Sequence, residues 1–271
     1  MKYNLDYLET HVVDHCNLNC KACCHYCNVT EPNFIDINSF TQDMIELAKK
    51  FDIKMIRLMG GEPLLAPDIT AFMENTRKCF PGSDIRIVTN GILLHTMDES
   101  FWECIAKNKI RIDLTKYPIP GTSFSKALDA IGEHLHRFYR NDKLGFFIQE
   151  NSFGGMWIAT QFQLTMNSNG INDISESFNK CPYKRCINLI NGHLAHCPTA
   201  GYIHNYNKYF GTNMPEEKGI GIYDNAPEKI LAYLNTPIPT CKYCVFDEDV
   251  KLQKWDFSRK EKDEWFVNKI Q

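Results

Sequence analysis

Short apolar runs alternate with helical apolar stripes along the N-terminal half of this chain. The run at 55–59 ends at a pair of glycines, which is typical of a buried strand. After Asp36, apolar residues at Phe40, Met44 and Leu47 recur at helical spacing and predict an amphipathic helix. In the same way we predict strands at 11–13, 55–59, 85–88 and 110–115, and helices opening at Asp36 and covering 67–79, 98–107 and 123–140. This alternation with short connections predicts parallel βαβ units with right-handed crossovers.

The pattern changes beyond residue 140. We predict a fifth strand at 144–148 and, because residues 151–179 are rich in Gly, Asn and Ser, an irregular bridge after it. We therefore expect two domains, residues 1–175 and residues 176–271. We also predict a β-hairpin over residues 186–197, because Asn191–Gly192 at its centre is the preferred residue pair for a type I′ turn.

Two further features of the C-terminal part follow from the same pattern. With a two-residue turn, Ile190 pairs with His193, and Cys186 comes to lie opposite Cys197. Near the C-terminus, four aromatic residues lie among many charged ones, and this pattern predicts an amphipathic closing helix. These residues are Trp255, Phe257, Trp265 and Phe266.

Composition narrows the class of protein. The chain has 271 residues, 44% of them hydrophobic, so we expect a sizeable core. A net charge of −3 without a long basic run argues against general nucleic-acid binding. No apolar stretch reaches about 18 residues, so we expect no membrane span. The N-terminus lacks the apolar region of a signal peptide, so we expect a cytoplasmic location, where cysteines serve as metal ligands more often than as disulfides.

Ten of the twelve cysteines fall into two groups, at 16–27 and 181–244. In the first group, Cys16, Cys20 and Cys23 follow the first predicted strand, at the end of a parallel sheet where ligands bind. Thiolates favour iron–sulfur clusters and zinc. A cubane 4Fe–4S cluster takes four ligands, so three thiols would leave one iron open to a small molecule. The other reading is a closed zinc site that adds Cys27.

Polar motifs follow the second and third predicted strands, and the fourth predicted strand contains an acidic residue. Gly60-Gly61-Glu62-Pro63 would let the backbone approach a ligand closely, and Glu62 could accept a charge-assisted hydrogen bond from an ammonium group. Thr89-Asn90-Gly91 ends the third strand, and Asp113 lies within the fourth. We expect these groups to face one pocket.

Cys-x3-Cys-x2-Cys followed by Gly-Gly-Glu-Pro resembles the radical S-adenosylmethionine (SAM) superfamily. The resemblance implies an α/β fold, a partial (β/α)6 TIM-like barrel, with a 4Fe–4S cluster on Cys16, Cys20 and Cys23. It also implies that SAM binds the open iron and is cleaved by an electron from the cluster to give a 5′-deoxyadenosyl radical. Residues implied to contact SAM are Gly60, Gly61, Glu62, Thr89, Asn90 and Asp113. A small reducing partner such as flavodoxin or ferredoxin is implied as well.

The second cysteine group predicts another metal site. Across the predicted hairpin, Cys186 and Cys197 would lie about 5 Å apart at Cβ, and Cys241-x2-Cys244 would complete a 4Fe–4S or zinc site. Cys181 could replace Cys186. The spacing of Cys181, Gly192 and Cys197 resembles the Cys…Gly-x4-Cys signature of twitch and SPASM domains, which implies a small C-terminal α+β domain with an auxiliary 4Fe–4S cluster. Whether Cys181 or Cys186 is the ligand stays open.

Three classes of function remain. The first is a radical SAM enzyme that oxidises or epimerises a sugar- or aminocyclitol-type small molecule. An auxiliary cluster could accept the second electron of an oxidation, and a spare thiol such as Cys24 or Cys27 could return a hydrogen atom in an epimerisation. The second is a peptide-modifying maturase, although the first strand begins within about ten residues of Met1 and leaves no room for a peptide-recognition module before it. The third is a non-catalytic metal-binding protein.

Overall fold

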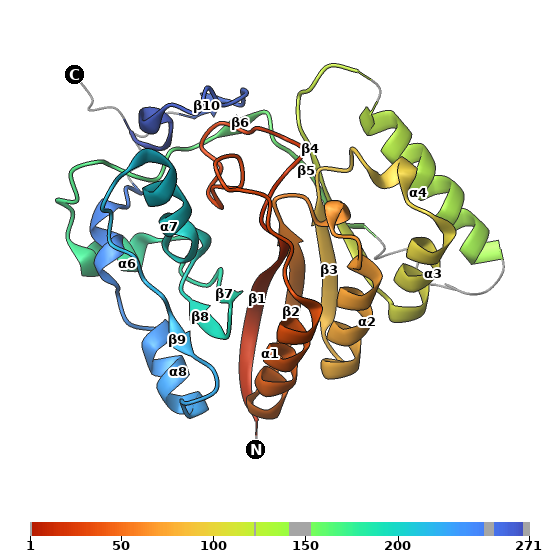
Figure 1. The fold of residues 1–271 in the computed structure, drawn as a ribbon, viewed down its shortest axis with the longest axis horizontal. Coiled ribbons are helices and arrows are strands. Elements are labelled where there is room, and N and C mark those ends of the chain that lie inside the picture. Colours follow the sequence, from red (N-terminus) through yellow and green to blue (C-terminus); the bar gives the residue numbers. More distant parts are fainter. Residues whose placement is uncertain (1, 122, 141–152, 247–251, 268–271) are drawn as a thin grey trace.

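The computed structural model describes residues 2–121, 123–140, 153–246 and 252–267. Its centre is an eight-stranded sheet in the order β5-β4-β3-β2-β1-β7-β8-β9 (Figure 1). The first five strands are β1 (Tyr3–Val13), β2 (Phe51–Gly60), β3 (Asp84–Thr89), β4 (Arg111–Lys116) and β5 (Phe153–Ile158). They pair in parallel, and so does β7 with the free edge of β1. The predicted α/β class with a mostly parallel sheet is therefore confirmed.

Four helices cover one face of this sheet (Figure 1): α1 (Ile37–Lys50), α2 (Ile69–Cys79), α3 (Glu99–Asn108) and α4 (Ser123–Arg140). Helix α1 begins where the side chain of Asp36 accepts a hydrogen bond from Ser39 N at 2.8 Å, as a helix N-cap does. Leu8 and Ile56 from the strands are buried in one cluster with Met44 from α1. All four helices were predicted, with ends that differ by at most a few residues.

The fifth parallel strand lies inside the segment that we expected to be irregular. Strand β5 occupies Phe153–Ile158, and the strand predicted at 144–148 falls outside the described residues. The expectation of an irregular bridge was therefore wrong for residues 153–158. Gly154 and Gly155 make a strand less favourable on its own, but here the strand has a partner. Pairing with β4 provides the backbone hydrogen bonds that the local sequence does not favour.

The C-terminal part adds β7, β8 and β9 to the same sheet. The elements of this part are β6 (Gln161–Phe162), α6 (Ile174–Lys180), β7 (Asn188–Ile190), β8 (His193–Ala195), α7 (Pro198–Phe210), β9 (Ile220–Gly221) and α8 (Pro227–Leu234). Asn191 and Gly192 both have positive φ, and Ile190 pairs with His193, so the predicted hairpin register is confirmed. Because β7 pairs with β1, one sheet crosses the proposed domain boundary at 175.

The tail returns to the start of the chain. Strand β10 (Gln253–Lys254) pairs with β6. In the described part of the tail, 252–267, the one helix is a short 3-10 helix (Lys262–Trp265), so the amphipathic closing helix predicted over 255–266 is wrong. Figure 1 shows β6 and β10 crossing the end of the sheet at which the loop after β1 lies. Backbone pairing with that loop replaces the intrahelical bonds that we expected. Among the described residues, no helix is both long and apolar enough to cross a bilayer.

Candidate functional site

One cavity of about 270 Å³ lies at the carboxyl ends of the parallel strands. All five cysteines of the first group line it, together with residues from the ends of β2, β3 and β4. From the predicted set the lining residues are Cys16, Cys20, Cys23, Gly60, Gly61, Thr89 and Asn90. The expected convergence of these motifs on one pocket is therefore present, and it arises because parallel strands end at the same edge of the sheet.

The two glycines bring the cysteine loop against β2. A Cβ atom on Gly60 would lie 2.0 Å from Val13 O, and one on Gly61 would lie 2.0 Å from His15 O. Gly61 N donates to Val13 O and Glu62 N donates to His15 O, both at 3.1 Å. We expected the missing side chains to admit a ligand. In the structure they admit the backbone of the loop that carries Cys16.

Glu62 lies behind the cavity wall and is fully buried. Its carboxylate accepts hydrogen bonds from Thr89 Oγ1 at 2.6 Å, Asn90 N at 2.9 Å and Leu64 N at 3.2 Å. Burial raises the pKa of Glu62 to about 7, and these three donors oppose that rise. Glu62 therefore orders the Thr89–Asn90 wall of the cavity from below.

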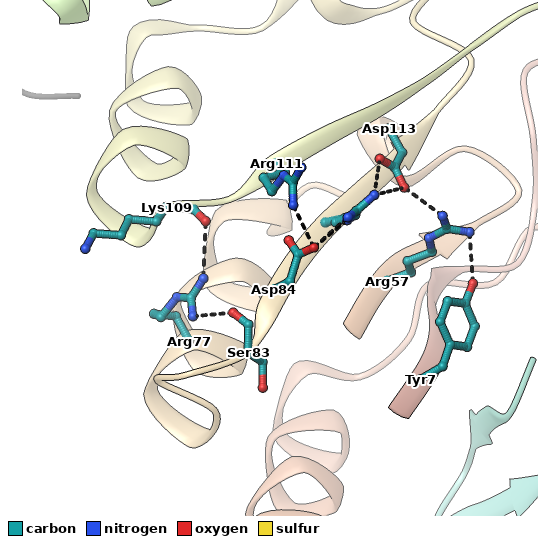
Figure 2. A network of polar contacts seen from close by, with 9 residues as sticks. Tyr7, Arg57, Arg77, Ser83, Asp84, Lys109, Arg111 and Asp113 are labelled. Carbon is teal, nitrogen blue, oxygen red and sulfur yellow. Dashed lines mark hydrogen bonds and ion pairs between the residues drawn. The ribbon is translucent and has the colours of Figure 1, made fainter. Parts of the chain in front are cut away.

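Asp113 is held away from the cavity by two arginines. Its carboxylate lies 3.0 Å from Arg57 Nη2 and 3.1 Å from Arg86 Nη1, and only 1% of its side chain is exposed. Figure 2 shows Arg57 between Asp113 and the hydroxyl of Tyr7. Asp113 does not line the cavity, whereas Thr115, two residues further along β4, does. The predicted contact with SAM has no support from this placement.

Within the first cysteine group, the three thiols of the predicted motif differ from one another in environment, and Cys27 contacts one of them. Burial raises the pKa of Cys16, and that of Cys20 to about 12, whereas a hydrogen bond from the Cys27 thiol lowers the pKa of Cys23 to about 7. Cys27 itself is buried, and its thiol also lies 3.6 Å from His25 O. Its contacts make Cys27 a support for Cys23.

The donor set can be compared with two kinds of metal centre. A single zinc ion needs sulfurs about 4 Å apart, since each Zn–S bond is about 2.3 Å. Within the part of the chain that the structure describes, no three Cys, His, Asp or Glu side chains are arranged around one ion in this way. A four-iron cluster is a larger body whose thiolates stand further apart. Three thiols that line one cavity without touching one ion position fit such a cluster.

A chain of imidazoles supports the loop from the other side. His11 Nδ1 lies 2.8 Å from Asp14 Oδ1, and His11 Nε2 lies 2.8 Å from His25 Nδ1. The ring of Tyr202, from α7, stacks on His11 at 4.0 Å. Burial lowers the pKa of His25 well below its usual value, so this ring is neutral. The cysteine loop is thus tied both to β1 and to the C-terminal part.

The second cysteine group gathers around Cys197 and Cys244. Burial raises the pKa of both thiols, and Cys181 and Cys241 lie close enough to raise both further. Cys186 also raises the pKa of Cys197, as the smallest of the three thiol contributions. Cys241 and Cys244 form a tight turn in which Cys244 N donates to Cys241 O at 3.0 Å. The electrostatic neighbours of Cys186 are instead Glu9 and Arg57, with Cys181 third. The hairpin prediction put Cys186 opposite Cys197, but the paired strands end at Asn188 and Ala195, before either cysteine.

A second cavity of about 480 Å³ opens beside the first and shares Ala22, Cys24, Gln161 and Phe162 with it. The thiol of Cys24 is accessible at this junction. Tyr183 lines the second cavity, and its pKa is raised by burial and then by the nearby thiols of Cys24, Cys186 and Cys181. The second cavity therefore lies between the two cysteine groups.

Thr115 and Trp255 are among the residues of the first cavity that sequence reasoning missed. The period of two along β4 could have indicated Thr115, which shares a strand face with Asp113. No local signal indicates Trp255, which reaches the cavity only through the pairing of β10 with β6.

Comparisons with known proteins agree with this geometry. A family model described as "Radical SAM superfamily" matches residues 11–138. GTP 3′,8-cyclase of Clostridium acetobutylicum is 32% identical over 125 residues, 45% of this chain and 38% of that relative. GTP 3′,8-cyclase of Thermodesulfovibrio yellowstonii is 36% identical over 95 residues, 34% of this chain and 29% of that relative. The chain thus matches well under half the length of each of these relatives.

A solved structure matches over most of the chain. The crystal structure of BtrN in complex with AdoMet and 2-DOIA covers 90% of this chain and 94% of its own, at 16% identity and a TM-score of 0.51. At that identity the likeness concerns the fold.

Proposed function

Because residues 11–138 form a radical SAM domain and the chain is an enzyme of that superfamily, we propose that it cleaves SAM reductively and abstracts hydrogen from a small polar substrate. The reaction would oxidise or epimerise a sugar- or aminocyclitol-type molecule. The observation that carries the proposal is the continuity of two cavities. One is lined by the three thiols, and the other lies between them and the second cysteine group.

The residues of the first cavity have distinct roles in this proposal. Cys16, Cys20 and Cys23 hold a 4Fe–4S cluster, which when bound supplies the electron that cleaves SAM. Gly60 and Gly61 keep the cysteine loop against β2. Glu62 is buried and does not line the cavity, but among the described residues its Oε2 accepts one hydrogen bond, from Asn90 N. In this proposal Asn90 moves aside when SAM binds, and Oε2 then accepts from the SAM ammonium group. Thr115 replaces Asp113 as the contact from β4.

The second cavity suggests the class of substrate. Its polar lining side chains are amides and hydroxyls, Gln161, Gln163, Thr165, Thr199 and Tyr183. None of its described lining residues is Lys or Arg, which a nucleoside triphosphate would require for its charge. Its volume of about 480 Å³ lies within the range of small-molecule sites. This composition favours a neutral or cationic polyhydroxylated molecule over the GTP named for the curated relatives.

The second cysteine group would hold an auxiliary cluster. We assign its ligands as Cys181, Cys197, Cys241 and Cys244, because Cys181 and Cys241 are electrostatic neighbours of both Cys197 and Cys244, whereas Cys186 comes after them at Cys197 and is not a neighbour of Cys244. Cys186 is then a spare thiol beside Glu9. An auxiliary cluster here could accept the second electron of an alcohol oxidation, and a flavodoxin or ferredoxin in a reducing cytoplasm would supply the first electron.

The test is an anaerobic incubation of the reconstituted full chain with SAM and dithionite, read for 5′-deoxyadenosine. We expect product from wild type and from Cys79→Ala, a control thiol on α2. We expect none from Cys20→Ala. Equal product from Cys20→Ala would contradict the assignment of the first group. Candidate substrates deuterated at a carbinol carbon should then pass deuterium into 5′-deoxyadenosine. If only a peptide passes its label, the enzyme is a maturase.

A further inference from the structure

The tail of the chain lies along the loop that carries the first cysteine group. Lys21 N donates to Asp256 O at 3.0 Å, and Ser258 N donates to Asn19 O at 2.8 Å. Asn19 Nδ2 donates to Ser258 O at 2.7 Å. An antiparallel bridge joins Cys20 to Phe257. The backbone of the tail is therefore in register with the middle cysteine of the loop.

This register brings two aromatic donors to Cys20. Trp255 precedes the paired segment, and Tyr117 follows β4; both line the first cavity with Cys20. Their rings lie 5.4 Å apart between centroids, at 45°. Each is close enough to Cys20 for its polar hydrogen to lower the pKa of that thiol, against the larger effect of burial. Two donors from segments far apart in sequence thus face one sulfur.

Trp255 Nε1 is an orphaned donor. The atom is buried, and it makes no hydrogen bond to any of the described residues. A buried N–H without a partner destabilises the fold, so such a group is expected to find an acceptor in the working protein. A protonated thiol is a weak acceptor, whereas an iron-bound thiolate is a strong one.

We propose that Trp255 N–H and Tyr117 O–H donate hydrogen bonds to the sulfur of Cys20 when it ligates the cluster, and that they raise the reduction potential of this cluster. Reduction adds one negative charge, and hydrogen bonds to a ligand sulfur stabilise the more negative state. The inference rests on the proposed function, because it needs a cluster on the first cysteine group. Trp255 and Tyr117 are positioning residues in this role, since they act through the cysteine.

The test is a redox titration of the reconstituted full chain, followed by the electron paramagnetic resonance signal that changes when SAM is added. We expect Trp255→Phe and Tyr117→Phe each to lower the ratio of reduced to oxidised cluster at a fixed potential by up to about tenfold. That change equals a shift of up to about 59 mV for one electron. The double variant should shift further. Tyr206→Phe is the matched control, because its hydroxyl donates to Lys262 O in the tail and not to a cysteine sulfur.

A second measurement does not depend on the potential. In wild type transferred to deuterated water, pulsed resonance should detect exchangeable deuterons coupled to the reduced cluster, and Trp255→Phe should lose one of these couplings. Unchanged potentials and unchanged couplings in both variants, with iron retained, would overturn the inference. If Trp255→Phe loses iron, Tyr117→Phe decides alone by the same readouts. Wild type without iron, or without a SAM-sensitive signal, would instead refute the proposed function.

Discussion

Asn90 Nδ2 donates a hydrogen bond to Asn17 Oδ1 at 2.7 Å and so joins the end of β3 to the loop of the first cysteine group. The same amide nitrogen lies 3.9 Å from Cys16 Sγ, and Asn90 Oδ1 accepts from Ile92 N at 3.0 Å. One side chain therefore links the proposed cluster site and the proposed SAM site. Its loss should affect both.

Asn90→Ala removes the hydrogen bond to Asn17 Oδ1, which joins the cysteine loop to the proposed SAM site. If this bond is worth roughly 1.5 kcal/mol, its loss should weaken SAM binding about tenfold. Equilibrium dialysis of the iron-loaded protein with labelled SAM measures this. Asn75→Ala is the matched control, because Asn75 makes a similar bond to Thr41 Oγ1 between α2 and α1. Equal SAM affinity in wild type and Asn90→Ala would count against the link.

The affinity for SAM should depend on pH through Glu62. Its pKa is raised to about 7 by burial, so the carboxyl group is mostly neutral at pH 6 and must lose a proton to pair with an ammonium group. Affinity should therefore rise about fivefold from pH 6 to 7. It should fall again above about pH 8, where an α-amino group loses its own proton. Glu62→Gln should lack the acid limb, and a wild-type profile that is flat from pH 6 to 7 would refute this role.

Asp113 should matter for stability more than for SAM. Asp113→Ala leaves Arg57 and Arg86 without this carboxylate, which should lower the free energy of unfolding by roughly 3 kcal/mol. This value lies at the low end for buried ion pairs, because both arginines keep some exposure. Urea denaturation measures the loss. Lys107→Ala, which removes an exposed pair with Glu74, is the control. A variant of normal stability with lost SAM affinity would restore the contact that we first predicted.

The two candidate ligands of the auxiliary cluster can be separated by iron content. If two 4Fe–4S clusters are present, wild type holds about eight irons. Cys181→Ala should lose about four of them, and Cys186→Ala should keep all eight. The reverse result would exchange the two assignments. Loss in both variants would mean that Cys186 supports the site through the fold.

Local sequence patterns predicted the elements whose hydrogen bonds are local or regular. Helix α1 could be read from its apolar stripe and its Asp36 cap, and the Asn191–Gly192 turn set the register of its hairpin correctly. The meeting of the cysteine loop with Gly60 and Thr89 also followed, because consecutive parallel strands end at one edge.

Interactions between distant segments were not predictable in this way. Asp113 has the position of a cavity residue on β4, and only the arginines on β2 and β3 show that its charge is already paired. The tail has the composition of an amphipathic helix, but strand β6 and the cysteine loop provide backbone partners for it. Neither competitor can be seen in the local pattern.

The hydrogen bond from Trp265 Nε1 to Cys23 O spans 242 residues of sequence. During synthesis, the loop that carries the first cysteine group emerges from the ribosome long before the tail that covers it. A growing chain therefore presents these thiols unshielded until nearly all of the described residues have been made. If this loop holds the proposed cluster, we expect the cluster to enter its finished environment only after the tail has been made, and we expect a chain cut short before residue 255 to leave the cysteine loop open to oxidation.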